Sequence, residues 1–151
     1  MKREQLISII DEAVNREDDS YTFYKLAAEK AQDTQTKSLF ERLSNEELKH
    51  KDYLEKFLQT KANTIKIDDS EDYNLSQEIE RPRMTTEINF TDAIKLAIKR
   101  EEEAMQMYAD IANSCLDEAE KGIFEGLSKM EKRHKTELEE MFLNVGFNEV
   151  W

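Results

Sequence analysis

The sequence repeats itself at an interval of 84 residues, and this repeat limits what the chain can fold into. The stretch "AVNREDDSYTFY" (Ala13–Tyr24) aligns with "AIKREEEAMQMY" (Ala97–Tyr108). The stretch "FERLSNEELKH" (Phe40–His50) aligns with "FEGLSKMEKRH" (Phe124–His134) at the same interval. A length of 151 residues is that of one domain. The repeat therefore predicts a single domain, residues 1–151, that contains two copies of one structural unit.

Each copy has the pattern of two helices. Apolar residues recur at steps of three and four, the spacing of a helix with one buried stripe. Three glycines and one proline leave few residues that would interrupt a helix. The pattern predicts an all-α fold of two helical hairpins. The apolar residues on the four stripes include Leu6, Ile10, Ala13, Tyr24, Ala27, Phe40, Leu43, Leu54, Phe57, Ile94, Ala97, Tyr108, Ile111, Phe124, Leu127, Leu138 and Met141.

We expect hairpin one at about residues 3–61 and hairpin two at about 91–144, with a short tail after the second. Tight turns are expected near residues 32–34 and 115–118. The helical periodicity fails between about residues 62 and 90, so we expect one long crossover there. Four helices with a single long middle connection match a known bundle topology, in which the second and third helices run parallel.

Helix ends are also visible in the sequence. Asp33 and Asp117 are candidate N-caps of the second and fourth helices, and Thr91 is a candidate N-cap of the third. Gly146 is expected to end the last helix, because glycine commonly follows a helix C-terminus.

The four apolar stripes are interrupted by polar residues near the middle of each helix. These residues are Glu17, Glu47 with His50, Glu101, and Glu131 with His134. A buried charge without a partner costs several kcal/mol, so the interruptions require a reason. Glu and His three residues apart lie on the same helix face. Residues equidistant from a hairpin turn lie at the same height, so we expect four carboxylates and two imidazoles to meet in mid-bundle.

This set of side chains suits two divalent cations. Four carboxylates balance the charge of two 2+ ions, and one neutral imidazole completes each position. Glu47 and Glu131 could bridge the two ions while Glu17 and Glu101 each bind one. Carboxylate and imidazole accept iron, manganese or zinc, so the donor set alone does not select the metal.

Together these motifs resemble those of a rubrerythrin-type member of the ferritin-like di-iron carboxylate superfamily. The resemblance covers about residues 3–144 and rests on E-x6-Y and E-x2-H, each present twice. It implies a ferritin-like four-helix bundle with two iron ions held by Glu17, Glu47, His50, Glu101, Glu131 and His134. It also implies that Tyr24 and Tyr108 hydrogen-bond to ligand carboxylates, although either tyrosine could simply fill the core. Relatives commonly reduce hydrogen peroxide, and others oxidise ferrous iron or activate oxygen.

The chain departs from the family pattern in two ways. Rubrerythrins carry a C-terminal rubredoxin-like module with four cysteines, whereas this chain has only Cys115. We therefore expect no iron–sulfur site and a separate electron-donor protein, such as a rubredoxin. Ala104 stands where many rubrerythrins have an extra glutamate one turn after the third-helix ligand. The sequence thus gives no support for the ligand shift that this glutamate makes in relatives.

The remaining expectations concern partners and compartment. A formal net charge of −12 disfavours nucleic acid and anionic membranes as partners. The methionines are interpreted as packing residues, and no haem is expected. The N-terminal apolar run is too short for a signal peptide or membrane span, so a cytoplasmic location is expected. The resemblance to the family implies a homodimer, and the long linker could allow helices to be exchanged between two chains.

Three functions stay open at this point. The first is a di-iron oxidoreductase that reduces hydrogen peroxide or oxygen. The second is a ferroxidase or iron-binding protein of the ferritin kind. The third is a helical interaction module with a vestigial or zinc site.

Overall fold

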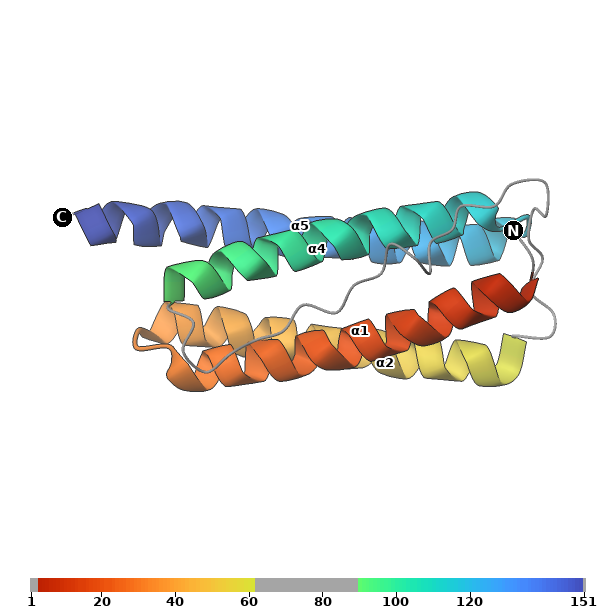
Figure 1. Ribbon diagram of the computed structural model, residues 1–151, viewed down its shortest axis with the longest axis horizontal. Coiled ribbons are helices and arrows are strands. Elements are labelled where there is room, and N and C mark those ends of the chain that lie inside the picture. Colours follow the sequence, from red (N-terminus) through yellow and green to blue (C-terminus); the bar gives the residue numbers. More distant parts are fainter. Residues whose placement is uncertain (1–2, 62–89, 151) are drawn as a thin grey trace.

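The computed structural model describes residues 3–61 and 90–150, which form four long helices (Figure 1). These are α1 (Arg3–Lys30), α2 (Thr34–Lys61), α4 (Phe90–Ser114) and α5 (Glu118–Val150). Helix α1 pairs with α2 and α4 with α5, as two antiparallel hairpins. Helices α2 and α4 run in the same direction, as the single-crossover topology requires. The all-α four-helix bundle expected from the sequence is confirmed.

Most of the expected helix boundaries agree with the structure, and two do not. The turns lie between Lys30 and Thr34 and between Ser114 and Glu118, as expected. Thr91 is not the N-cap of α4, because the helix already begins at Phe90. Gly146 does not end α5, which continues to Val150, so the expected C-terminal tail is helical. A glycine inside a helix costs only about 1 kcal/mol relative to alanine and does not by itself end one. The expected crossover at 62–90 lies almost entirely outside the described residues.

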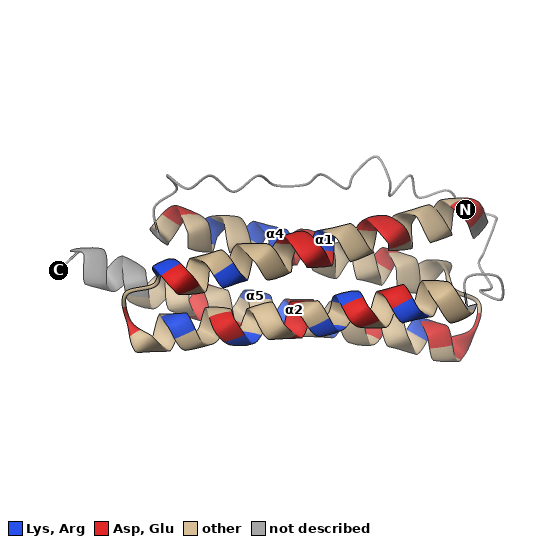
Figure 2. Ribbon diagram, turned by 90° about the horizontal axis from the view of Figure 1, so that it is seen from below, with Lys and Arg blue, Asp and Glu red and all other residues tan. Residues whose placement is uncertain are grey.

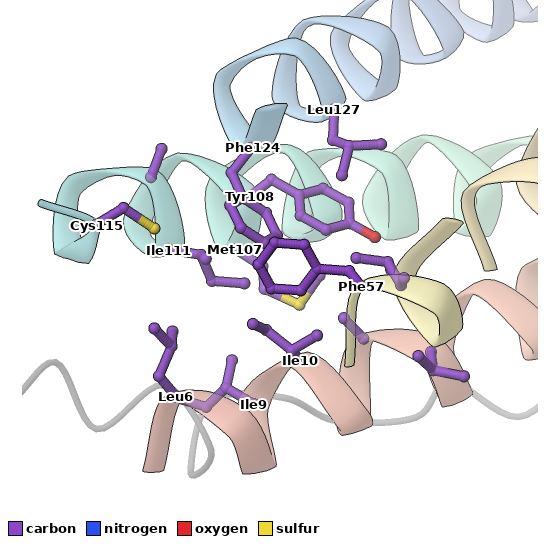
Figure 3. Packing of buried hydrophobic residues seen from close by; sticks show 14 residues of the cluster. Leu6, Ile9, Ile10, Phe57, Met107, Tyr108, Ile111, Cys115, Phe124 and Leu127 are labelled. Carbon is purple, nitrogen blue, oxygen red and sulfur yellow. The ribbon is translucent and has the colours of Figure 1, made fainter. Parts of the chain in front are cut away.

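The apolar core is divided into two clusters. One contains residues near the N-terminus of α1 and the C-terminus of α4, including Ile10, Phe57, Tyr108 and Phe124. Figure 3 shows these side chains converging from all four helices. The second cluster, near the opposite end of the hairpins, includes Tyr24, Phe40, Ile94 and Leu138. Every predicted stripe residue of α2 is buried, from Phe40 to Phe57.

The repeat is visible in the contacts that fix each hairpin. Asp33 Oδ1 accepts a hydrogen bond from Thr36 N at 2.9 Å, and Asp117 Oδ1 accepts one from Glu120 N at 3.0 Å. Both aspartates therefore cap a helix N-terminus, as the sequence predicts. The two hairpins thus share side-chain contacts as well as backbone shape.

Charged residues cover the outside of the bundle. Figure 2 shows acidic and basic residues interspersed along α1 and α2. None of the helices in the described parts of the chain has a stretch long and apolar enough to span a membrane.

The cap at Asp33 gives a first prediction. Thr36 donates two hydrogen bonds to this exposed carboxylate and holds its pKa below the ordinary value. The cap therefore stabilises the fold above the ordinary aspartate pKa, and this stabilisation is lost as the pH falls through the lowered value. We expect Asp33→Ala to lower the free energy of unfolding by about 1 kcal/mol at pH 7. In urea titrations the difference from wild type should shrink in strong acid.

Asp11→Ala is the matched control, because Asp11 is exposed within α1 rather than at its end. An equal loss of stability in both variants would contradict the capping role.

Candidate metal centre

The structure brings all six predicted ligand residues together between the two apolar clusters. One comes from α1 (Glu17), one from α4 (Glu101), and a Glu–His pair from each of α2 and α5. Each is buried, with an exposed fraction between 0% for Glu131 and 5% for His50. The expectation that four carboxylates and two imidazoles meet inside the bundle is therefore correct.

The six side chains form two overlapping groups of four. One consists of Glu17, Glu47, His50 and Glu131, and the other of Glu101, Glu47, His134 and Glu131. Within each group, one nitrogen or oxygen atom per residue lies within 4.8 Å of the others. Glu47 and Glu131 belong to both groups, which is the arrangement expected of bridging carboxylates.

Each histidine turns Nδ1 toward the centre of the cluster, and of the two shared glutamates, Glu47 and Glu131, this atom lies closer to the one on the other hairpin. His50 Nδ1 is 2.8 Å from Glu131 Oε1, whereas it is 3.5 Å from Glu47 Oε1. His134 Nδ1 is 3.1 Å from Glu47 Oε1 and 4.0 Å from Glu131 Oε2. The two rings are nearly parallel, with centroids 6.0 Å apart. The interior of the cluster is therefore shared between the hairpins.

Tyr24 and Tyr108 support the outer glutamates reciprocally. Tyr24 Oη donates to Glu101 Oε1 at 2.6 Å, and Tyr108 Oη donates to Glu17 Oε1 at 2.5 Å. Each hydroxyl thus reaches the glutamate of the opposite hairpin. Burial, followed by the charge of that glutamate, raises both tyrosine pKa values well above the ordinary value. Both tyrosines are therefore neutral hydrogen-bond donors at neutral pH.

Several buried polar atoms of the cluster have the character of a cation site. Among the described residues, the following buried atoms make no hydrogen bond of good geometry, although each imidazole Nδ1 lies close to a carboxylate oxygen: Glu17 Oε2, Glu101 Oε2, Glu47 Oε1, both oxygens of Glu131 and the Nδ1 atoms of His50 and His134. Such atoms are costly to bury unless something compensates them. All six residues contribute at least one, and oxygen with imidazole nitrogen is a donor set for iron, manganese or zinc. The residues present therefore fit two divalent cations.

The carboxylate pKa values show how unfavourable the negative charge is at this position. Burial, with the charge of Glu47 added, raises the pKa of Glu17 to about 8. Burial also raises the pKa of Glu131 well above its ordinary value, with Glu101 and Glu47 contributing. Burial acts in the same direction on Glu47, but the two nearby histidines outweigh it and lower its pKa.

The histidines respond in the opposite sense. Burial lowers the pKa of His50, but the carboxylates of Glu17 and Glu47 outweigh it and raise the value to about 10. Glu101 and Glu47 likewise raise the pKa of His134 to about 11. The cluster therefore attracts positive charge, whether as protons or as cations, and cation binding must displace the protons.

The structure also adds residues that the sequence analysis did not single out. Glu46 Oε2 lies 2.5 Å from Nε2 of His134, on the side of the ring away from the cluster. Arg16 and Arg100, which directly precede Glu17 and Glu101 in the sequence, are also buried. Arg100 donates to Ser20 Oγ at 2.9 Å, and Arg16 pairs with Glu103 at 3.1 Å. The repeated Arg-Glu pair in "NRED" and "KREE" was the available signal for the arginines.

Ala104 packs against the apolar cluster, and neither neighbouring glutamate takes the place of the extra ligand that the sequence resemblance led us to look for. Glu102 is exposed, and Glu103 is held by Arg16. Neither belongs to the two groups of clustered side chains.

The fold and the buried carboxylate–histidine cluster define a ferritin-like four-helix bundle with a candidate two-metal centre. The family model for rubrerythrin matches residues 8–142 of the sequence. The chain belongs to the rubrerythrin family.

Two solved structures have the same fold. A hypothetical protein from Pyrococcus furiosus is 26% identical, with a TM-score of 0.71 over 92% of this chain and 90% of its own. A Thermotoga maritima protein, named as of the ferritin-like diiron-carboxylate kind, is 17% identical. Its TM-score is also 0.71, and the match covers 94% of this chain and 95% of its own. A search of curated proteins found no significant match.

The second prediction concerns metal loading. Anaerobic addition of ferrous ions should raise the melting temperature, because ions that bind only the folded state stabilise it. At a free-ion concentration of 100 Kd each site contributes about 2.7 kcal/mol. Two filled sites should therefore raise the midpoint by roughly 10–20 °C in a domain of this size. Elemental analysis should find two ions per chain.

The variant Glu47→Ala, Glu131→Ala removes both shared glutamates and should abolish the shift. Its control is Glu55→Ala, Glu139→Ala, a second pair at the same 84-residue interval that lies outside the cluster. A shift that survives in the first variant would refute the ligand assignment.

The third prediction concerns Tyr108. Replacing it with phenylalanine leaves Glu17 Oε1 buried without its donor, which costs about 1–3 kcal/mol. Urea unfolding of the metal-free protein should show this loss, and Tyr21→Phe at the half-buried surface should change stability by less than about 0.5 kcal/mol. In a double-mutant cycle with Glu17→Gln, purely additive losses would mean that the hydroxyl does not act through Glu17.

Proposed function

We propose that this rubrerythrin-family protein is a two-iron oxidoreductase that reduces hydrogen peroxide, or oxygen, at the buried cluster. The observation that carries the proposal is the meeting of four buried carboxylates and two imidazoles with unpaired donor atoms inside the bundle. Membership of the rubrerythrin family also supports a two-iron site in this protein. Glu17 and Glu101 would each hold one ion, Glu47 and Glu131 would bridge, and His50 and His134 would complete the two positions.

Iron would contribute the electrons of the reaction. Reduction of hydrogen peroxide to two waters takes up two electrons and two protons, and a pair of bound ferrous ions would supply the two electrons. The charge of the four carboxylates suits both oxidation states, since they can balance two 2+ ions completely and two 3+ ions in part.

The protein's own residues would position and isolate the site. Tyr24 and Tyr108 each hold one oxygen of Glu101 and Glu17, and the other oxygen of each carboxylate is buried without a hydrogen bond among the described residues. Phe40 stacks on Tyr24 and Phe124 on Tyr108, at centroid distances of 5.9 and 6.5 Å. The apolar clusters on both sides keep bulk water away from the carboxylates, which strengthens their electrostatic interactions.

Reduction of the ferric site requires an external source of electrons. We propose a separate electron-donor protein of the rubredoxin kind, since the described residues hold no second group suited to relay electrons. Homodimer formation and a cytoplasmic location stay predictions from the sequence.

The fourth prediction tests the reaction. In stopped-flow mixing, the ferrous-loaded protein should be oxidised faster by hydrogen peroxide than by oxygen, with one peroxide consumed per two ferrous ions. The Glu47→Ala, Glu131→Ala variant should react no faster than free ferrous iron, while Glu55→Ala, Glu139→Ala should react like wild type.

Other results of these experiments would favour a ferroxidase or a zinc-binding protein. A rate with peroxide no greater than that with oxygen would remove the peroxidase form of the proposal. Oxidation of many ferrous ions per chain by a large assembly would indicate a ferroxidase. Two zinc ions that iron does not displace would keep the ligands and remove the redox chemistry.

A further inference from the structure

The two halves of the cluster have equivalent ligands but unequal surroundings. On the side of the ring away from the cluster, Nε2 of His134 contacts Glu46 Oε2 at 2.5 Å. Nε2 of His50 is also buried, yet it has no hydrogen-bond partner among the described residues. The position that the repeat relates to Glu46 is Met130, which offers no carboxylate. Both histidines face carboxylates through Nδ1, but among the described residues only His134 has a carboxylate partner at Nε2.

The carboxylate of Glu46 is held in place from its other side. Its Oε1 atom lies 3.3 Å from Arg133 Nη2 and 3.6 Å from Arg42 Nη1. Both arginines also pair with Glu137. Glu46 is thus oriented with one oxygen toward two guanidinium groups and the other toward the imidazole.

The whole of this network is absent from the related positions. At the 84-residue interval, Gly126 corresponds to Arg42, Lys49 to Arg133 and Tyr53 to Glu137. The ligands, the tyrosines and the capping aspartates all keep the 84-residue interval, so this is a local departure from an otherwise preserved pattern. The difference between the two halves is therefore built into the sequence and does not depend on one rotamer.

The contact with Glu46 should change how His134 binds a cation. An ionised carboxylate only accepts hydrogen bonds, so Nε2 of His134 must carry the hydrogen. Nδ1, which faces the cluster, is then the nitrogen that a cation can bind, and the carboxylate makes it more basic. Loss of such a partner typically weakens metal binding by 10–100-fold. His50 receives neither the fixed tautomer nor the added basicity.

From this arrangement we infer that Glu46 is a positioning residue that makes the two metal positions unequal. The position formed by His134 and Glu101 binds a divalent cation more tightly and fills first, and the position formed by His50 and Glu17 fills second. This inference rests on the proposed two-metal function, because it concerns the same cluster.

The fifth prediction uses zinc, which is diamagnetic and binds the same donor types. The chain has two histidines, so protein labelled with ¹⁵N-histidine and free of any histidine tag gives signals from two imidazoles only. During a zinc titration the ring signals of His134 should shift over the first equivalent and those of His50 over the second. The variant His50→Ala lacks the ring signals of His50 and so shows which signals belong to each histidine. Calorimetry should show two steps.

Three variants separate positioning from a general structural effect. Glu46→Met copies the residue of the other half and should weaken the first step by roughly 10–100-fold while leaving the second unchanged. Glu46→Gln keeps an acceptor oxygen for Nε2 and should restore part of the loss. Glu55→Met makes the same substitution outside the cluster and should leave both steps as in wild type.

The outcomes distinguish this inference from the proposed function. If both histidines shift together, or Glu46→Met leaves the first step unchanged, the inference is wrong while the two-metal site stands. If the steps are unequal but the ferrous protein reduces neither peroxide nor oxygen, the inference stands and the proposed function fails. Absence of any metal binding would overturn both.

Discussion

The mutual repulsion of four buried carboxylates is the constraint on which the rest of this structure depends. Two unit charges 4 Å apart interact with about 4 kcal/mol at an effective dielectric constant of 20. Bringing Glu17, Glu47, Glu101 and Glu131 together is therefore unfavourable unless positive charge is present at the same place. The raised pKa values of both histidines are the response of the protein itself to this requirement. Divalent cations would meet it more completely.

The position of the cluster explains the length and packing of the helices. Apolar layers on both sides, one around Phe124 and one around Phe40, offset the cost of burying charge in the middle. Each ligand side chain also leaves a rigid helix well away from its frayed ends, so its backbone is fixed by many turns on either side. A shorter bundle could hold the same residues but could not exclude water from them as well.

Most of the fold and the ligand cluster could be read from the sequence because both follow from helical periodicity. The stripe from Phe40 to Phe57 and the caps at Asp33 and Asp117 are local patterns, and the structure agrees with them. The end of α5 could not be found in this way, because a single glycine is a weak signal. Glu46 was also missed, because it stands beside a ligand residue and looks like an exposed acid. Its contact with His134 depends on how α2 and α5 are rotated against each other, and no local pattern encodes that rotation.

The repeat also restricts where the two halves of the site can become different. Glu47 and Glu131 each belong to both groups of clustered side chains, so under the proposed function a substitution in either would alter both metal positions at once. Glu17 and Glu101 belong to one group each, but under the proposed function replacing either would remove a ligand. A residue that contacts one histidine from outside changes the basicity of that ligand and leaves the donor set intact. A preserved set of ligands with divergent residues at 46 and 130 is therefore the pattern expected when two ions bound to repeated halves acquire different properties.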